Sequence, residues 1–363
     1  MSQLYPSPPA RAIAVAGGGI IGLSIAWRLA QRGFRVAVFE RSSPGQEASW
    51  AGAGMLAPGG EFDSSSDVTA LAIESRSVYL DFVRELHEAT QVEIDYQDCG
   101  ALDLAYEPAA WQALQRRADR QATLGILSRP LTLDRIKAFW PRVRLEGLQG
   151  ALFYPGDAVV NPRELLISLV AACRKLGVEF FEMSPIESVE MSAGCASVRT
   201  AAQVSNFEAV VIAAGAWSSS IELQGVPKLP ESVPVKGHLI GFRQPGQTCN
   251  TILRRGHSYL FQRANGLLVC GASVERVGWD RSVDPAIAAS LARDAGVVLP
   301  HLAETTPSEA WIGFRPDSDS LHLGQWHSRR LYLAYGHYRN GILLAPVTAR
   351  NIAREISASL EKQ

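Results

Sequence analysis

The hydrophobic positions near the N-terminus predict a strand, a helix and a second strand in close succession. Residues 11–16 include a short run rich in Ala, Ile and Val, and residues 35–39 form a second apolar run. Residues 20–32, between these runs, contain no proline and suit a helix. Because a strand, a helix and a strand of these lengths form one βαβ unit, the pattern predicts a parallel sheet.

The turn between the first strand and the helix carries the glycine spacing GxGxxG. Gly17 suits the tight turn, Gly19 allows the backbone to approach a pyrophosphate, and Gly22 allows the helix to pack on the strand. The helix N-terminus favours the negative charge of that pyrophosphate. Glu40 ends the second strand, 18 residues after Gly22, where its carboxylate can accept hydrogen bonds from ribose hydroxyls. Together these features predict a dinucleotide-binding site.

The rest of the chain alternates between helical and strand-like periodicity. Residues 68–90 show an apolar helical face that contains Leu71, Val78, Phe82 and Leu86. Other helices are expected over 108–125, over 131–140, from Asn161-Pro162 to before Gly177, over 286–297, and in a last segment that ends near 357. Strands are expected within 91–105, near 150, and at 178–182, 186–189, 196–200, 207–215, 233–243, 257–263, 266–275 and 330–334.

The length of 363 residues exceeds one typical hydrophobic core, so we expect two domains. The βαβ-like alternation returns after residue 150 and again near the C-terminus, whereas residues 233–275 are typical of antiparallel strands. We therefore predict an α/β fold with a discontinuous Rossmann-like FAD/NAD(P)-binding domain and an α+β substrate domain. The expected ranges are 1–90, 150–230 and 310–363 for the first domain, and 91–149 and 231–309 for the second.

Composition and charge argue against several classes of function. Lys and Arg together number 35, Asp and Glu number 36, and no long basic stretch is present, which argues against nucleic acid or an anionic membrane as partner. The five cysteines and seven histidines show no metal-ligand spacing, so we expect reduced thiols, a cytoplasmic location and no metal site. Residues 13–30 are mostly apolar, but three consecutive glycines and a start without Lys or Arg argue against a membrane span or secretory signal.

Several motifs in combination resemble the D-amino-acid-oxidase-type family of FAD-dependent oxidoreductases, and within it the glycine oxidases of thiamine biosynthesis. The motifs are GGGIIG, Glu40, ASWAGAGML, VVNP, VVIAAGAWS, VPVKG, GFRP and GHYRNGILLAP, and the match extends from about residue 12 to 355. The resemblance implies non-covalent FAD and an antiparallel sheet over the flavin. It also implies oxidation of the amine of glycine or another small amino acid to an imine, which water hydrolyses, while oxygen is reduced to hydrogen peroxide.

The resemblance further assigns residues to the cofactor and to the substrate. The expected cofactor contacts are Gly17, Gly19, Ile20, Ile21, Gly22, Glu40, Arg41, Ala48, Ser49, Ala53, Gly54, Met55, Ile186, His337, Tyr338, Arg339, Asn340, Gly341, Ile342 and Leu343. The expected substrate residues are Arg315, Tyr259, Arg339, Met55, His257 and Val274. Backbone N–H groups at the start of the last helix would stabilise the negative charge of the reduced flavin.

Two of these residues suit carboxylate recognition on chemical grounds alone. Arg315 stands in the apolar sequence WIGFRPD, and its planar guanidinium can donate two parallel hydrogen bonds to a carboxylate. The alternative is a structural ion pair with Asp317. Tyr259 either donates its hydroxyl to the same carboxylate or is an ordinary strand residue. No side chain stands out as a general base, so the expected catalytic gain comes from positioning.

Several alternatives remain open at the level of sequence. Val274 occupies a position at which a relative has methionine, so the pocket could be larger and favour sarcosine or small D-amino acids. Arg339 could contact the substrate or only clamp a domain seam. The enzyme could also be a dehydrogenase that uses another electron acceptor, a nicotinamide-dependent dehydrogenase, or a non-catalytic flavin-binding subunit. We expect a homo-oligomer with a small amino acid and oxygen as partners.

Overall fold

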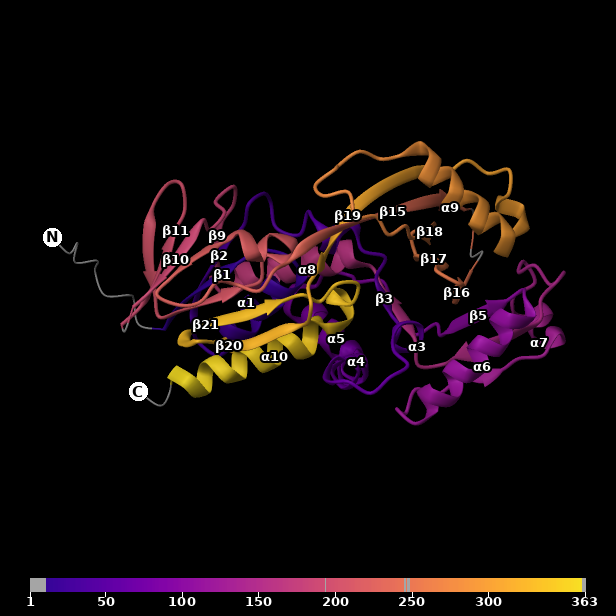
Figure 1. Cartoon of the computed structure of the whole chain (residues 1–363), viewed down its shortest axis with the longest axis horizontal. Helices are drawn as coiled ribbons and strands as arrows, with labels where there is room; N and C mark the ends of the chain where they lie inside the picture. Colours follow the sequence, from indigo (N-terminus) through magenta and orange to yellow (C-terminus); the bar gives the residue numbers. More distant parts are fainter. Residues whose placement is uncertain (1–10, 193, 245, 247–248, 361–363) are drawn as a thin grey trace.

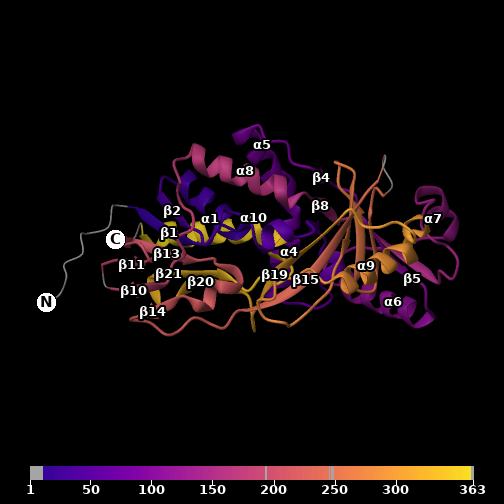
Figure 2. The same ribbon diagram turned by 90° about the horizontal axis from the view of Figure 1, so that it is seen from above.

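The computed structural model describes residues 11–192, 194–244, 246 and 249–360. Two main sheets organise this part of the chain, one of six strands and one of eight. Figure 1 shows them at opposite ends of an elongated molecule, with strands β15 (Val233–Arg243) and β19 (Glu309–Asp317) reaching from the middle into the second sheet. The view from above in Figure 2 shows the same arrangement.

The six-stranded sheet has the strand order β20-β21-β13-β1-β2-β9. All neighbouring strands in it are parallel except β20 and β21, which are antiparallel. Its strands are β1 Ala12–Ala16, β2 Arg35–Phe39, β9 Glu179–Phe181, β13 Ala209–Ile212, β20 His322–Trp326 and β21 Ser328–Tyr335. The predicted βαβ unit is therefore confirmed, with α1 (Ile20–Gln31) between β1 and β2.

The central parallel strands β1, β2 and β13 are buried on both faces, which explains why they are almost uniformly apolar. Ile13 and Val15 of β1 belong to the core beneath the helices α1, α8 (Pro162–Lys175) and α10 (Gly341–Leu360). Ala14 points to the opposite face and packs with Val189 and Val198. That face is covered by a four-stranded sheet of β10 Ser188–Met191, β11 Ala196–Arg199, β12 Val204–Phe207 and β14 Glu222–Gln224.

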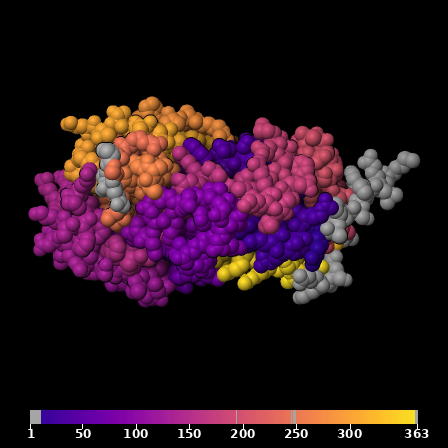
Figure 3. Space-filling view, turned by 180° about the vertical axis from the view of Figure 1, so that it is seen from behind, coloured from indigo at the N-terminus to yellow at the C-terminus, as the bar shows by residue number. Residues whose placement is uncertain are grey.

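The eight-stranded sheet has the order β19-β15-β18-β17-β16-β5-β7-β6. Its other strands are β5 Ala101–Ala105, β6 Arg129–Pro130, β7 Gly150–Tyr154, β16 Ile252–Arg255, β17 Ser258–Gln262 and β18 Leu267–Gly271. Helix α9 (Pro285–Val298) packs on β15, β17 and β18, and α6 (Pro108–Ala122) packs on β5 and β7. Figure 3 shows from behind that the segments around 100–150 and 250–300 form one end of the molecule.

Short elements join the two main sheets. Strands β3 (Met55–Leu56), β8 (Ala158–Val160) and β4 (Tyr96–Gln97) form a third sheet, of three strands. The remaining elements are α2 Ala48–Ala51, α3 Pro58–Glu61, α4 Asp67–Ser77, α5 Tyr79–Thr90, α7 Leu133–Phe139, η1 Gly215–Ser220 and η2 Pro300–Leu302.

The structure refines several predicted elements. The single helix predicted over 68–90 is wrong, because the chain breaks at Val78 into α4 and α5. Asn161 caps α8 as predicted, since its side chain accepts a hydrogen bond from the Arg163 N–H at 3.2 Å. Strands β16, β19 and β20 were not predicted.

Two segments fall in a different sheet from the one that the predicted domain ranges imply. Strand β7 begins at Gly150 and β19 ends at Asp317, and both were expected in the dinucleotide domain. Both strands instead belong to the eight-stranded sheet. The division of the chain into domains by residue ranges stays a prediction. Within the described residues, no helix combines the length and the apolar character needed to cross a membrane.

A histidine is buried where β21 passes into α10. His337 is 5% exposed, and its Nε2 lies 3.1 Å from the Thr348 hydroxyl of α10. Burial lowers the pKa of His337 from 6.5 to about 3, because the imidazolium would lose its hydration there. The folded protein therefore holds this imidazole neutral at neutral and mildly acidic pH.

We predict that this histidine costs the protein stability in acid. Below pH 6.5 the unfolded chain takes up a proton at His337, whereas the folded chain does so only near pH 3. The free energy of unfolding therefore falls as the pH drops, by about 2 kcal/mol at pH 5 relative to pH 8. Urea unfolding at both pH values should show this loss in the wild type and a smaller loss in His337→Gln. The exposed His257→Gln serves as control, and an equal loss in all three proteins would contradict the assignment.

Candidate functional site

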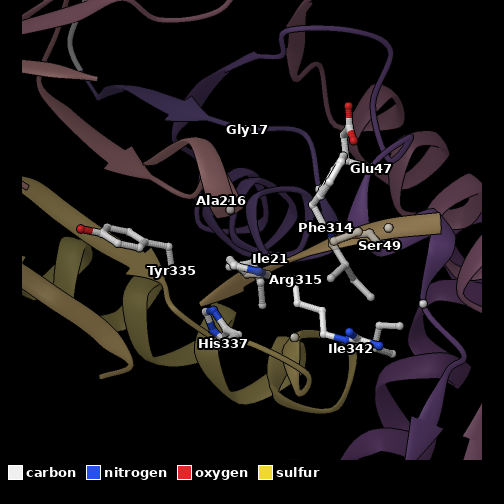
Figure 4. A pocket seen from close by; sticks show the side chains of 18 of the residues that line it. Gly17, Ile21, Glu47, Ser49, Ala216, Phe314, Arg315, Tyr335, His337 and Ile342 are labelled. Carbon is white, nitrogen blue, oxygen red and sulfur yellow. Dashed lines mark hydrogen bonds between the residues drawn. The ribbon is translucent and has the colours of Figure 1, made fainter. Parts of the chain in front are cut away.

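A cavity of about 440 Å³ lies where the two main sheets approach each other. Its walls come from the glycine turn after β1, residues 47–57, strands β15, β17 and β19, and the loop between β21 and α10. Figure 4 shows Gly17, Ser49, Phe314, Arg315, His337 and Ile342 around it. Segments that are far apart in sequence therefore build one site.

Most of the predicted site residues line this cavity. They are Gly17, Gly19, Ile20, Ile21, Glu40, Arg41, Ala48, Ser49, Ala53, Gly54, Met55, Ile186, Tyr259, Arg315, His337, Tyr338, Arg339, Asn340, Gly341 and Ile342. The cavity thus brings together the residues expected at the cofactor and those expected at the substrate.

Four predicted residues are not among the residues that line the cavity. Gly22 lies below the glycine turn, and Leu343 belongs to the core beneath α10. His257 is exposed in the turn between β16 and β17, and Val274 is 53% exposed after β18. Neither side chain is among those that enclose the cavity with Arg315 and Tyr259, and the assignment of His257 and Val274 to the pocket stays a prediction.

The glycine turn is compact enough to require glycine. Gly17 has a φ of +105°, and a Cβ added there would lie 2.4 Å from the Ala213 carbonyl oxygen. A Cβ at Gly22 would lie 2.0 Å from the Gly17 carbonyl oxygen. Helix α1 begins directly after Gly19, which provides no side-chain cap. Apart from the Ile20 N–H, which donates to the Ser49 hydroxyl, the N–H groups of its first turn can therefore face an anionic ligand in the cavity.

Glu40 holds the turn in place as well as lining the cavity. The carboxylate accepts hydrogen bonds from the Gly18 N–H at 2.7 Å and from the Ser42 N–H at 3.0 Å. The Ser42 hydroxyl donates a third hydrogen bond to it at 3.2 Å. Because a carboxylate has about four lone-pair sites, these three bonds still leave capacity for a ribose hydroxyl. Nearby, the Arg41 guanidinium lies 4.1 Å from the ring centre of Trp217, which also lines the cavity.

The segment from Ala48 to Leu56 is packed between the sheets and is not a flexible loop. The Ser49 hydroxyl accepts a hydrogen bond from the Ile20 N–H at 2.9 Å, which joins α2 to the first turn of α1. On the other side, the Trp311 indole donates to the Ala51 carbonyl at 2.9 Å. A Cβ at Gly313 would lie 2.6 Å from the Ala51 methyl group, so β19 contacts α2 directly.

Arg315 presents a guanidinium to the cavity from strand β19. Its Nη1 donates to the backbone carbonyls of Ser273 at 3.0 Å and Lys236 at 3.4 Å. The predicted alternative, an ion pair with Asp317, is wrong, because Asp317 pairs with Arg276 at 2.6 Å. Among the described residues, no carboxylate lies within ion-pair distance of Arg315. Burial lowers the pKa of this arginine, since its charge is poorly hydrated.

Tyr259 on β17 lies at the same part of the cavity. Its side chain is buried, and burial raises its pKa to about 12. The hydroxyl is therefore protonated at physiological pH and can donate a hydrogen bond. Arg315 and Tyr259 together offer a charged and a neutral donor to one anionic group.

Sequence reasoning missed several residues that line the cavity. They are Phe39, Glu47, Glu61, Trp217, Gly237, Leu239, Gly313, Phe314 and Pro316, among others. Some of them lie inside motifs that were recognised, such as Trp217 in VVIAAGAWS and Gly237 in VPVKG. Glu61 has no such motif, and only the fold brings it to the cavity.

The N-terminus of α10 also faces the cavity. Helix α10 begins at Gly341, and Asn340, Gly341 and Ile342 all line the wall. The N–H groups of a first helical turn have no partner within the helix and stabilise nearby negative charge. No group of three or more metal-binding side chains occurs in the described ranges, and the five cysteines are free.

The cavity fits a dinucleotide with a flat ring system. The glycine turn and the open start of α1 suit a pyrophosphate, and Glu40 suits a ribose. The apolar wall of Ala51, Ala53 and Leu239 suits one face of a ring. The start of α10 suits the polar edge of a flavin that becomes negative on reduction.

Comparisons with known proteins agree with this geometry. The profile of the family described as FAD dependent oxidoreductase matches residues 12–355. A protein named glycine oxidase from Geobacillus kaustophilus (strain HTA426) is 32% identical over 345 residues, covering 94% of this chain and 91% of the relative. The bifunctional protein ThiO/ThiG of Trichormus variabilis is 34% identical over 350 residues, covering 94% of this chain but 52% of the relative.

Solved structures show the same likeness. The crystal structure of glycine oxidase from Geobacillus kaustophilus superimposes with a TM-score of 0.89 at 30% identity, covering 98% of this chain and 96% of that chain. These matches confirm the predicted fold class and favour FAD over a nicotinamide. The chain belongs to the family of FAD-dependent oxidoreductases, and it is an enzyme whose cofactor is FAD.

Proposed function

We propose that this enzyme oxidises the amine of glycine, or of a similarly small amino acid, to the imine. Water then hydrolyses the imine to the 2-oxo acid and ammonia, so glycine gives glyoxylate. The two electrons pass to oxygen, which becomes hydrogen peroxide. The names of the relatives from Geobacillus kaustophilus and Bacillus licheniformis, both glycine oxidase, support this reaction.

The observation that carries the proposal is that the Arg315 guanidinium has no carboxylate partner among the described residues. Its Nη1 is anchored by two backbone carbonyls, and no carboxylate of the described chain neutralises it. A buried cation without a counterion is costly, so the site is built for an anionic ligand. A substrate carboxylate would supply the missing charge and would accept two hydrogen bonds from the guanidinium.

The residues of the chain position the substrate. Arg315 would hold the carboxylate, and the Tyr259 hydroxyl would donate a second contact to it. The apolar wall excludes water from the reacting carbon, and the start of α10 supplies N–H groups for developing negative charge. FAD, when bound, supplies the two-electron acceptor for the hydride of the substrate. Positioning of this kind reduces the barrier without a general base.

The same proposal includes substrates other than glycine. Sarcosine and D-alanine also carry a small amine beside a carboxylate, and they are the main alternatives to glycine. Val274 is exposed and does not line the cavity, so the proposed preference for small substrates rests on the residues that do line it. None of the five cysteines of the described chain lines the cavity, which supports non-covalent FAD.

We further propose a cytoplasmic homo-oligomer. The five free cysteines support a reducing compartment. Light scattering of the purified enzyme would give the assembly state directly.

An anaerobic spectrum tests the reaction. We predict that glycine, added without oxygen, bleaches the visible flavin bands, and that air restores them with formation of hydrogen peroxide. Sarcosine and D-alanine, added separately, rank the substrates. Bleaching that air does not reverse would identify a dehydrogenase with another acceptor. Flavin bands that none of the three amines bleaches would contradict the proposed substrate class.

Replacement of Arg315 tests the carboxylate contact. We predict that Arg315→Ala raises the apparent KM for glycine about 10- to 100-fold, since a hydrogen bond to a charged group contributes about 1.5–3 kcal/mol. The apparent KM of Arg315→Lys should lie between those of the wild type and Arg315→Ala, because lysine keeps the charge but loses the planar fork. FAD content should stay unchanged in both variants. Arg276→Ala removes an arginine that pairs with Asp317 outside the cavity and is the matched control; an unchanged KM in Arg315→Ala would remove Arg315 from the site.

A further inference from the structure

Among the described residues, one carboxylate, that of Glu61, lines the cavity beside the substrate residues. Glu61 is the last residue of α3, and the same cavity is lined by Met55, Tyr259 and Arg315. The Glu61 side chain is 19% exposed, and its Oε1 lies 3.0 Å from Nη2 of Arg339. Glu61 and Arg339 both contribute to the electrostatic environment of Tyr259 and Arg315. These five side chains define what we call the substrate end of the cavity.

A buried polar network fixes Glu61 in this position. Arg254 forms ion pairs with Asp103 and, at 2.8 Å, with Asp157, and all three side chains are largely buried. Asp157 also accepts a hydrogen bond from the Gly59 N–H of α3 at 3.1 Å. A Cβ at Gly60 would lie 2.3 Å from Nη1 of Arg254, so α3 rests directly on this network. The backbone of α3 is therefore fixed by contacts with Asp157 and Arg254, which keep Glu61 at the cavity.

The ion pair sets the charge of the substrate end. Arg315 and Arg339 are positive and Glu61 is negative, so these three side chains sum to one positive charge. The other charged residues that line the cavity lie on segments expected at the cofactor, and Glu47 is itself paired with Arg281 at 2.8 Å. One excess positive charge matches one carboxylate. A second anionic group on the substrate would compete with Glu61 for Arg339 and would be repelled by it.

We propose that Glu61 is a specificity-determining residue, which restricts the enzyme to amino acids with a single anionic group by neutralising Arg339. This inference rests on the proposed function, since it concerns the substrate of the same site. It predicts that the wild type discriminates between two ligands of similar shape that differ in one carboxylate. Sarcosine and iminodiacetate form such a pair, because iminodiacetate carries a carboxyl group on the N-methyl carbon of sarcosine.

The test variant is Glu61→Gln, which keeps the size of the side chain and a carbonyl acceptor for Arg339 but removes the charge. We predict that the ratio of kcat/KM for iminodiacetate to that for sarcosine rises at least about tenfold over the wild type. Glu61→Asp keeps the charge and should keep a ratio near that of the wild type. Glu74→Gln breaks a similar ion pair, with Arg350, outside the cavity and should leave the ratio unchanged. A general loss of folding or of flavin would lower both activities and would not raise the ratio.

A binding measurement separates this inference from the proposed reaction. Methoxyacetate and diglycolate are the ether analogues of the same two substrates, and they contain no amine to oxidise. Their Kd values follow from the change in the visible flavin spectrum of the holoenzyme. We predict that Glu61→Gln shifts the Kd ratio towards diglycolate by the same factor, even if no amine proves to be a substrate. Arg339→Gln should shift the Kd ratio towards methoxyacetate, because Glu61 is then an unpaired anion that repels the second carboxylate.

The outcomes are distinct. If the wild type binds methoxyacetate but oxidises none of the amines, the proposed function fails. The Kd ratios then still decide whether Glu61 sets the preference for ligands with a single carboxylate. If both ratios stay within twofold of the wild type in Glu61→Gln and in Arg339→Gln, Glu61 does not set specificity and the inference is overturned.

Discussion

The architecture depends on the close packing of residues 48–61 between the two main sheets. This segment contacts the dinucleotide side through the Ser49 hydroxyl, which accepts from the Ile20 N–H. It contacts the eight-stranded sheet through Ala51, which meets Gly313 and Trp311. Gly54 has a φ of +100°, and a Cβ there would lie 1.9 Å from the Val160 carbonyl oxygen. Because the segment is fixed on several sides, the two halves of the cavity keep one relative position.

The two ends of the cavity are suited to negative charge through different groups. The cofactor end relies on backbone: the glycine turn, the open start of α1 and the start of α10 offer N–H groups that carry partial positive charge. The substrate end relies on charged side chains, namely Arg315 and the Arg339–Glu61 pair. Backbone donors suit the spread charge of a pyrophosphate or reduced flavin, whereas a guanidinium fork suits the compact charge of one carboxylate.

The sequence was informative where a function requires a local pattern. The βαβ unit, the glycine turn and Glu40 lie within thirty residues, and their spacing alone predicts their arrangement. The cap at Asn161 could be predicted for the same reason. The break at Val78 could not, because the apolar face of 68–90 continues through it and tertiary packing decides where the helix ends.

The substrate end was only partly predictable, because its geometry depends on contacts between distant segments. Arg315 and Tyr259 were recognised from their motifs, whereas the anchoring carbonyls of Lys236 and Ser273 appear only in the fold. Glu61 was missed since nothing near it in sequence marks a carboxylate as enclosed. His257 and Val274 are exposed beside this end and do not line the cavity, because proximity to Tyr259 and to β18 in sequence does not decide where a side chain points in a turn.

The most direct test of the central claim is a crystal structure of the enzyme with FAD and methoxyacetate bound. We predict that the carboxylate of methoxyacetate lies about 3 Å from the guanidinium of Arg315 and from the hydroxyl of Tyr259. The methylene carbon should lie next to the flavin ring. A carboxylate bound elsewhere, with Arg315 still in contact only with the carbonyls of Lys236 and Ser273, would contradict this prediction.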